Sequence, residues 1–455
     1  MKPQRIRDPL HDLIEFDATA FEQSLWDVLN STEFQRLRRI KQLGFSELVY
    51  PGATHTRFAH SVGVFHTARE LSRLIKTRLG DAFDPDRART ALAAALVHDV
   101  GHGPFSHAFE DSVKQLDSRR GIKNQKRHES WTAEIIRGET EIGRKLENGL
   151  GKEMREAIAV LLLQETPTDI YSAIVSSQFD ADRLDYVRRD RLMTGAQHGG
   201  FDFSWLIANL EVDKVPLSTD GDTFANVDCL ILGHKAFQAA ESYVLGLFHL
   251  YFAVYFHKAT RSAEKMLTEI FVRLGGMVLD KKLGESGLFE GHPLVEFISH
   301  RSLPSYLDLD DSVVWGSLPL LSRAADPMVK ELSNRLLTRR LYKAVDISAR
   351  FRGKGDETSV AKFRALLTDA KNSGEFGECD IFEDTPKRNP YKRRGYNSPE
   401  GLSKVLIRRS SGGAYEDLAS ISSVVGALQE QSIYRVYVRD EVVREKILNI
   451  AKGVE

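Results

Sequence analysis

The stretch ALVHDVGHGPFSH, residues 95–107, places three histidines and an aspartate directly after an apolar helical pattern. Such residues either support a turn in the core or hold a metal ion and do chemistry. Imidazole and carboxylate together form a mixed nitrogen and oxygen donor set, which suits Mn, Fe, Zn, Ni or Mg. Half of the 14 histidines lie between residues 55 and 128, and this clustering favours the metal site.

His98 and Asp99 are the first candidate ligands. Neighbouring side chains on a regular helix point about 100° apart, so both reach one ion only near a helix end. Gly101 and Gly103 permit such a break, and Pro104 prevents the helix from continuing unbroken. The sequence therefore predicts that a helix ends close to His98.

Two further segments offer partners for this pair. In RFAHS, His60 is a candidate third ligand, and Arg57 either binds a phosphate or forms a salt bridge. In SSQFDADRLDYVRRD, residues 176–190, acids alternate with arginines. This segment is either a solvated helix or the source of a last carboxylate ligand, with Arg183 and Tyr186 facing a polyphosphate.

Helices must position most of these residues. AFEQSLWDVLN, HTARELSRLIKTRL and KATRSAEKMLTEIFVRL carry apolar residues at three- and four-residue spacing. After about Asn372 turn residues and charges dominate, followed by the short alternating runs KVLIRR and YRVYVRD and a final helix, EVVREKILNIAK. We expect a mainly α protein, with a helical body over residues 1–370 and a small α/β lobe with a charged loop over residues 371–455.

Bulk properties exclude several classes of protein. The hydrophobic share of 42%, charged share of 28% and net charge of −1 are typical of a soluble globular protein without a global field toward nucleic acid or membrane. Two cysteines cannot build a disulfide framework, which favours a cytoplasmic location. No signal peptide is expected at the N-terminus. The apolar run 244–256 contains His249 and is too short to span a bilayer, so we expect a buried helix there and no membrane association.

The motif order His60, His98-Asp99, Asp182 resembles that of the HD-domain metal-dependent phosphohydrolases. DPLHD (8–12), STEFQRLRRIKQLG (31–44), PGATHTRFAHSVGV (51–64), HDVGHGPFSH (98–107) and DADRLDYVRRD (180–190) also follow the order of one subfamily. That subfamily comprises the deoxynucleoside triphosphate triphosphohydrolases (dNTPases, including dGTPases) of the type that in animals carries a sterile-alpha-motif domain. The resemblance spans most of the chain and implies an HD-domain helical bundle.

The resemblance also implies roles for individual residues. The divalent metal ligands would be His60, His98, Asp99 and Asp182. Active-site residues would be His102, His107, His128 and the orienting acid Glu110. Substrate contacts would come from Gln42 and Leu43 at the deoxyribose, Arg57 and Arg183 at phosphates, Tyr186 and Asp190 at the phosphates and sugar 3′-hydroxyl, and Tyr255 near the base.

The implied reaction is attack of metal-activated water on the α-phosphate of a deoxynucleoside triphosphate, which releases deoxynucleoside and inorganic triphosphate. We assign His107 as the acid that protonates the leaving oxygen, supported by His128 and Glu110. His102 either contacts phosphate or helps to hold a second metal. The subfamily further implies a homo-oligomer, a dimer or tetramer.

Two departures from the subfamily limit what can be transferred. Gln35 and Arg38 match the residues that bind an activating guanine nucleotide in the animal enzyme, but Asn30 stands where that enzyme has an aspartate that reads the guanine. The resemblance therefore leaves open whether a nucleotide activator is a partner of this protein. Phe256 replaces a polar residue near the base, so the base preference does not transfer.

Two other functions remain open at the level of sequence. The first is an HD-type nuclease or phosphodiesterase acting on single-stranded nucleic acid or another nucleotide, for which the basic runs 387–394 and 408–411 would bind a backbone. The same runs also suit phosphate binding at a subunit interface or a plain solvated loop. The second is a non-catalytic nucleotide sensor, which the complete ligand set disfavours.

Overall fold

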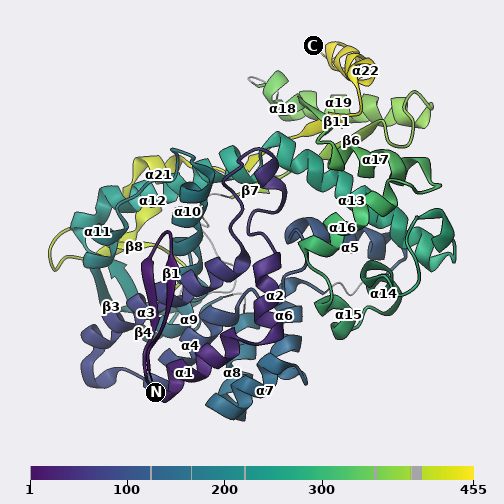
Figure 1. The fold of residues 1–455 in the computed structure, drawn as a ribbon. Helices are drawn as coiled ribbons and strands as arrows, with labels where there is room; N and C mark the ends of the chain where they lie inside the picture. The colour runs from purple at the N-terminus through teal and green to yellow at the C-terminus, as the bar shows by residue number, and fades with distance from the viewer. Residues whose placement is uncertain are drawn as a thin grey trace.

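The computed structural model describes residues 2–122, 126–164, 166–219, 222–352, 356–389, 391 and 402–454. Figure 1 shows a large helical body and a smaller C-terminal lobe of helices and short strands at the top of the view. This arrangement confirms the expected mainly α fold with a small α/β lobe. Across the described ranges no single helix is long and apolar enough to cross a membrane; only the bent pair His234–Tyr255 and Lys258–Leu279 passes that test of length and composition together.

The chain begins with an antiparallel hairpin of β1 (Gln4–Asp8) and β2 (Asp12–Phe16), in which Asp8 pairs with Asp12 at the turn. Apolar residues of the second strand, Ile14 and Phe16, are completely buried against the body. The hairpin is therefore fixed to the core by alternate side chains of β2, as expected for a strand with one buried face.

The next helices form the part of the body that carries the histidines. Their order is α1 (Ala20–Leu29), α2 (Thr32–Arg36), α3 (Arg57–Leu79), α4 (Pro85–Val97), α5 (His107–Arg119), α6 (His128–Arg137), α7 (Glu141–Leu150), α8 (Lys152–Leu163), α9 (Ile170–Ala173) and α10 (Ala181–Thr194). The run ALAAALV before His98 is almost entirely buried in α4, between α3 and α8. Helix α4 ends at Val97, so the predicted break beside His98 is confirmed.

The second half of the body completes the walls around these helices. Its elements are α11 (Phe203–Ala208), β3 (Leu210–Thr219), β4 (Asp222–Leu232), α12 (Phe237–Leu250), α13 (Lys258–Leu279), α14 (Pro293–His300), α15 (Leu303–Leu307), α16 (Asp311–Leu321) and α17 (Pro327–Leu337). The apolar run 244–256 forms the end of α12 and a π-helical turn over Tyr251–Tyr255. Helix α13 packs against α5 of the body and against strand β5 (Lys343–Asp346) of the lobe, and so links the two.

The C-terminal elements divide between lobe and body. They are β5 (Lys343–Asp346), α18 (Ile347–Arg350), α19 (Asp356–Asn372), β6 (Ile381–Asp384), β7 (Lys387–Arg388), β8 (Leu406–Arg408), β9 (Tyr415–Asp417), α20 (Leu418–Ile421), α21 (Ser423–Ala427), β10 (Gln431–Ser432), β11 (Arg435–Val438) and α22 (Glu441–Lys452). The lobe sheet has the order β5-β11-β6. The hydrophobic core of the lobe includes Val345, Phe363 and Val436. The run KVLIRR instead forms β8, which pairs in parallel with β4 of the body.

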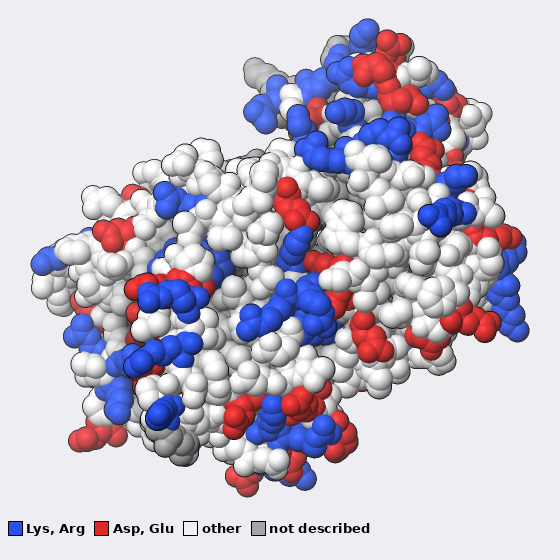
Figure 2. All heavy atoms as spheres, viewed as in Figure 1, with Lys and Arg blue, Asp and Glu red and all other residues white. Residues whose placement is uncertain are grey.

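The basic runs are engaged locally where the structure describes them. Arg388 lies over the ring of Tyr251 at 3.9 Å, and Arg408 pairs with Glu211 and Asp213. Pro390 and residues 392–394 of the first run lie outside the described residues. Figure 2 shows both signs of charge interspersed over the face in view, in keeping with the net charge of −1.

Candidate active site

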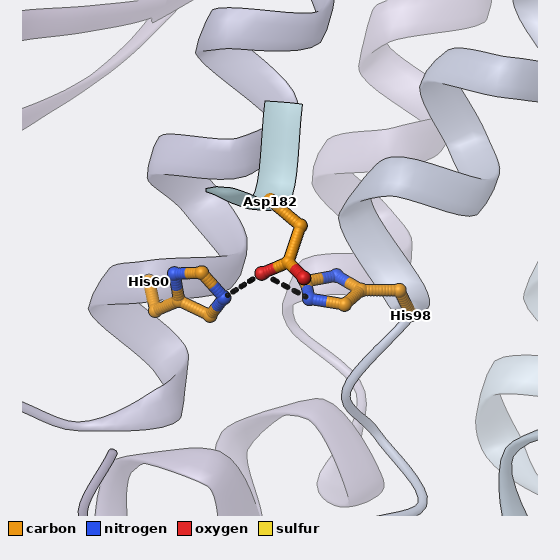
Figure 3. A group of neighbouring side chains, drawn as sticks. All are labelled: His60, His98 and Asp182. Carbon is orange, nitrogen blue, oxygen red and sulfur yellow. Dashed lines mark hydrogen bonds and ion pairs between the residues drawn. The ribbon is translucent and has the colours of Figure 1, made fainter. Parts of the chain in front are cut away.

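Three residues from different helices converge on one point inside the body. Oδ1 of Asp182, in the first turn of α10, lies 3.0 Å from Nε2 of His60 on α3 and 3.8 Å from Nε2 of His98 at the end of α4. Figure 3 shows the carboxylate of Asp182 between the two imidazole rings. The structure thus brings together three of the four residues expected as metal ligands.

The opposite ring nitrogens are held by oxygen acceptors. Nδ1 of His98 lies 2.9 Å from the carbonyl oxygen of Ala95, and Nδ1 of His60 lies 2.9 Å from Oδ2 of Asp185. A carbonyl oxygen only accepts, so Nδ1 of His98 carries the proton and Nε2 presents its lone pair. This orientation is the one that metal-bound histidines adopt.

The electrostatics of this point favour a cation. Burial alone would lower the pKa of His60, but the hydrogen bonds to Asp182 and Asp185 raise it to about 10. A positive charge between Nε2 of His60 and the carboxylate of Asp182 is therefore favourable, and either a proton or a metal ion can supply it. Two imidazoles and a carboxylate suit a divalent transition metal, so the residues present fit the cofactor that the sequence implies.

Asp99 lies at the edge of the same group. Its Oδ1 is 3.2 Å from Nε2 of His98, its Oδ2 is 3.8 Å from Nε2 of His60, and Arg57 donates to Oδ2. Burial alone would raise the pKa of Asp99, but Arg57 and the adjacent histidines hold it well below its usual range. Asp99 is therefore an ionised carboxylate shared between the cluster and Arg57.

A second group of polar residues surrounds Glu110 on α5. Its carboxylate accepts from Nδ1 of His128 at 2.7 Å and from Nδ1 of His107 at 3.2 Å. Burial alone would lower the pKa of His128, but Glu110 raises it, while these histidines hold the pKa of Glu110 far below its usual range. His102 stacks on His128 with ring centroids 3.9 Å apart, and burial together with Arg57 keeps its pKa well below its usual range. Neutral His102 thus adjoins a histidine that favours its charged form.

The turn that links α4 to α5 is unusually tight. A Cβ on Gly101 would lie 2.3 Å from the backbone oxygen of His128, so no larger residue fits without movement. Phe105 and Ser106 adopt positive φ angles of 52° and 55°, which are costly for residues other than glycine. Oδ1 of Asp311 accepts from the backbone N–H of Phe105 at 2.7 Å and helps to hold this turn. Such strain, fixed by the surroundings, is common at functional sites.

Behind the cluster lies a buried charge network that sequence reasoning missed. Asp185 is fully buried and accepts from Arg189, from His60 and from Nε2 of His11, the last at 2.7 Å. Arg189 also donates to Asp8 at 2.8 Å. Asp8 and His11 belong to the segment DPLHD at the turn of the N-terminal hairpin, so the hairpin supports His60 through Asp185. Asp185, Arg189 and Asp190 are all buried, so the solvated-helix interpretation of 176–190 is wrong.

Two cavities adjoin this group. The first has a volume of about 760 Å³ and exposes His60, His98, Asp99 and Asp182 together with His102 and His128. The second, of about 250 Å³, is lined by aromatic, aliphatic and polar residues that include Leu43, Phe105, Asp190, Tyr255 and Phe256. Both cavities share four lining residues, Gln42, Arg57, His107 and Tyr186.

Most residues expected to contact substrate line these cavities. Asp190, in the second cavity, accepts from Tyr255 at 2.6 Å and lies 2.8 Å from Nε2 of His55. Arg183 differs, because it lines neither cavity and donates to Asp180 and to the carbonyl of Ser177. Asn30 caps the end of α1 by donating to the carbonyl of Trp26, outside both cavities.

Comparison with known proteins identifies the family. The HD domain model matches residues 57–187, which contain the whole cluster. The uncharacterized protein YwfO of Bacillus subtilis is 33% identical over 350 residues, or 75% of this chain and 72% of YwfO. The chain belongs to the HD-domain phosphohydrolases.

Other relatives of this HD-domain protein refine that placement. The deoxynucleoside triphosphate triphosphohydrolase SAMHD1 of Danio rerio is 27% identical over 388 residues, which cover 76% of this chain and 56% of SAMHD1. A crystallised phosphohydrolase from Bacteroides thetaiotaomicron shares the fold, with a TM-score of 0.72, 24% identity and coverage of 96% of this chain and all of that one. This HD-domain protein is therefore similar to deoxynucleoside triphosphate triphosphohydrolases over about half of their length.

Proposed function

We propose that this HD-domain protein hydrolyses deoxynucleoside triphosphates to deoxynucleoside and inorganic triphosphate. One observation carries the proposal. The cavity that exposes the histidine and aspartate cluster adjoins a smaller aromatic cavity, and the two share Gln42, Arg57, His107 and Tyr186. A nucleotide with its phosphates in the first cavity and its nucleoside in the second would place the bond between them beside these shared residues.

The first cavity supplies the charge that a triphosphate requires. His60, His98, Asp99 and Asp182 would hold a divalent cation, which when bound polarises a phosphoryl oxygen and lowers the pKa of water. Arg57 lines the cavity while its guanidinium contacts Asp99 and Ser106, so its position is fixed before substrate arrives. Fixed donors of this kind stabilise charge on phosphate oxygens without reorganisation.

The second cavity supplies contacts for a deoxynucleoside. Tyr255 and Phe256 offer aromatic surface, and Leu43 offers an apolar wall. The carboxylate of Asp190 is oriented by Tyr255 and His55 and still has lone pairs for a sugar hydroxyl. An apolar wall beside the sugar leaves an extra 2′-hydroxyl without a partner, which disfavours ribonucleotides.

The histidine group supplies a proton to the leaving 5′-oxygen. Hydrolysis breaks the bond between the α-phosphorus and that oxygen, forms a bond to water oxygen and leaves an alkoxide that must be protonated. His107 lies between the cavities with its side chain 72% exposed, and Glu110 connects it to His128. His107 is therefore placed to donate a proton to the leaving 5′-oxygen. Glu110 orients both His107 and His128 through hydrogen bonds to their Nδ1 atoms.

The test is an assay of the purified protein, loaded with Mn, Fe, Mg, Zn or Ni, against each dNTP, each NTP and short single-stranded DNA. We expect deoxynucleoside and triphosphate in equal amounts, little turnover of NTPs, and no turnover for His107→Ala. Addition of a second nucleotide at sub-saturating substrate tests activation in the same assay. Mononucleotides released from DNA would instead indicate the nuclease alternative, and binding without any turnover would indicate a sensor.

A further inference from the structure

A charged pair lines the second cavity and has no part in the chemistry described above. Arg261 and Glu264, one turn apart on α13, both face this cavity. Nη1 of Arg261 donates to Oε2 of Glu264 at 2.6 Å, and their side chains are 17% and 20% exposed. Neither residue lines the first cavity, to which His60, His98 and Asp182 are exposed.

The lobe fixes the position of this pair. Asp384, at the end of β6, accepts from Nε and Nη2 of Arg261 at 2.9 and 2.7 Å and lies 3.1 Å from Nζ of Lys265. This bidentate contact sets the plane of the guanidinium. Two cations and two carboxylates meet here, so the group is neutral overall and suits a neutral polar ligand better than a phosphate.

Glu264 keeps one oxygen available to a ligand. Within the described part of the chain, Oε1 of Glu264 accepts no hydrogen bond, because the contact with Arg261 uses Oε2. The side chain of Glu264 is only 20% exposed, so its carboxylate is poorly solvated. This burial raises the pKa of Glu264, although Arg261 opposes the shift. A desolvated carboxylate oxygen beside a fixed guanidinium presents an acceptor next to a donor.

We infer that Arg261 and Glu264 read the Watson–Crick edge of the nucleobase and select guanine. Guanine presents O6 as an acceptor followed by the N1–H and N2–H donors, which match Arg261 and Glu264 in that order. Thymine offers a weaker match through O4 and N3–H. Adenine and cytosine present a ring nitrogen acceptor where the carboxylate lies, which leaves both partners unsatisfied. This inference rests on the proposed function, since it requires the nucleoside in the second cavity.

The experiment compares kcat/KM and binding for the four dNTPs. Binding is measured with analogues in which a methylene group replaces the 5′-oxygen, because water does not cleave the resulting P–C bond. The protein is compared with Glu264→Gln and with the control Glu269→Gln on the same helix, which pairs with Arg119 outside both cavities. Two altered nucleotides complete the set: dITP, which lacks the N2 amino group, and 7-deaza-dGTP, which lacks N7.

We expect dGTP to be preferred over dATP and dCTP by about tenfold or more, the range for hydrogen bonds to a charged group. Glu264→Gln should remove most of this preference, with little change for dATP, while Glu269→Gln keeps it. The dITP value should fall several-fold, and the 7-deaza-dGTP value should stay within about twofold of dGTP.

Other results would either overturn or support the selection of guanine by Arg261 and Glu264. Equal kcat/KM for all four dNTPs would overturn it while the proposed function stands, as would a uniform loss for every base in Glu264→Gln. If no dNTP is hydrolysed, the proposed function fails and the analogues decide: guanine-selective binding lost in Glu264→Gln supports the inference, and equal binding of the four bases overturns it.

Discussion

Nδ1 of His60 lies 2.9 Å from Oδ2 of the fully buried Asp185. A carboxylate therefore holds the edge of this ring that is opposite to the nitrogen facing Asp182. Asp185 is itself held by Arg189 and by His11 of the N-terminal hairpin. Residues 174 positions apart in the sequence thus cooperate to orient one imidazole.

Substitution of Asp185 by Asn should weaken metal binding, because the amide no longer fixes the ring of His60 as a carboxylate does. We expect metal affinity, measured by competition with a chelator, to fall about 10–100-fold, the usual effect of removing such a partner. His11→Gln, which leaves Asp185 and Arg189 paired, should show a smaller loss in the same direction. Asp280→Asn, at an exposed pair with Arg120, is the control. Unchanged affinity in folded Asp185→Asn would contradict the positioning role.

Substitutions of Asp182 and His107 should affect metal binding and turnover differently. Asp182→Ala removes the carboxylate between His60 and His98, so metal content by mass spectrometry should drop to background. His107→Ala should retain the metal, because His107 lies outside that cluster, yet lose turnover. Turnover that persists in His107→Ala would exclude it as the proton donor.

The pair of Glu110 and His128 predicts a pH effect. Burial lowers the pKa of His128, but the hydrogen bond to Glu110 at 2.7 Å more than reverses this and raises it. The charged imidazole therefore stabilises the fold fully below about pH 6.5, and this contribution is lost as the pH rises through the raised folded pKa. In Glu110→Gln the pKa of His128, followed by NMR, should fall because the carboxylate that raises it is gone. The alkaline limb of activity should move to lower pH with it. An unchanged titration would show that Glu110 does not set this pKa.

The turn after His98 predicts a steric effect. A Cβ on Gly101 would meet backbone atoms of His128 and Thr132 at 2.3 Å, so Gly101→Ala should destabilise the protein by about 1–3 kcal/mol. Gly276→Ala, on α13 with open space around the new methyl, should instead stabilise it by about 0.5–1 kcal/mol. Thermal unfolding of the two variants should therefore shift in opposite directions, and equal shifts would contradict the close approach.

The helices and the histidine cluster were predictable because their signals are local. Apolar spacing marks α3, α4 and α13, and Gly101 and Pro104 mark the end of α4. Long-range features were not predictable in the same way. The partners of Asp185 come from the hairpin, and the parallel pairing of β8 with β4 depends on a contact between distant segments. Arg183 shows the same limit, since its contact with Asp180 directs it away from the cavities and no spacing rule reveals that choice.

The central claim is hydrolysis at the α-phosphorus of a dNTP beside the cluster of His60, His98 and Asp182. Hydrolysis of a dNTP in ¹⁸O-labelled water, followed by mass spectrometry of both products, tests it most directly. We expect one ¹⁸O atom in the inorganic triphosphate and an unlabelled deoxynucleoside. Label in the deoxynucleoside, or release of deoxynucleoside monophosphate and pyrophosphate, would contradict it.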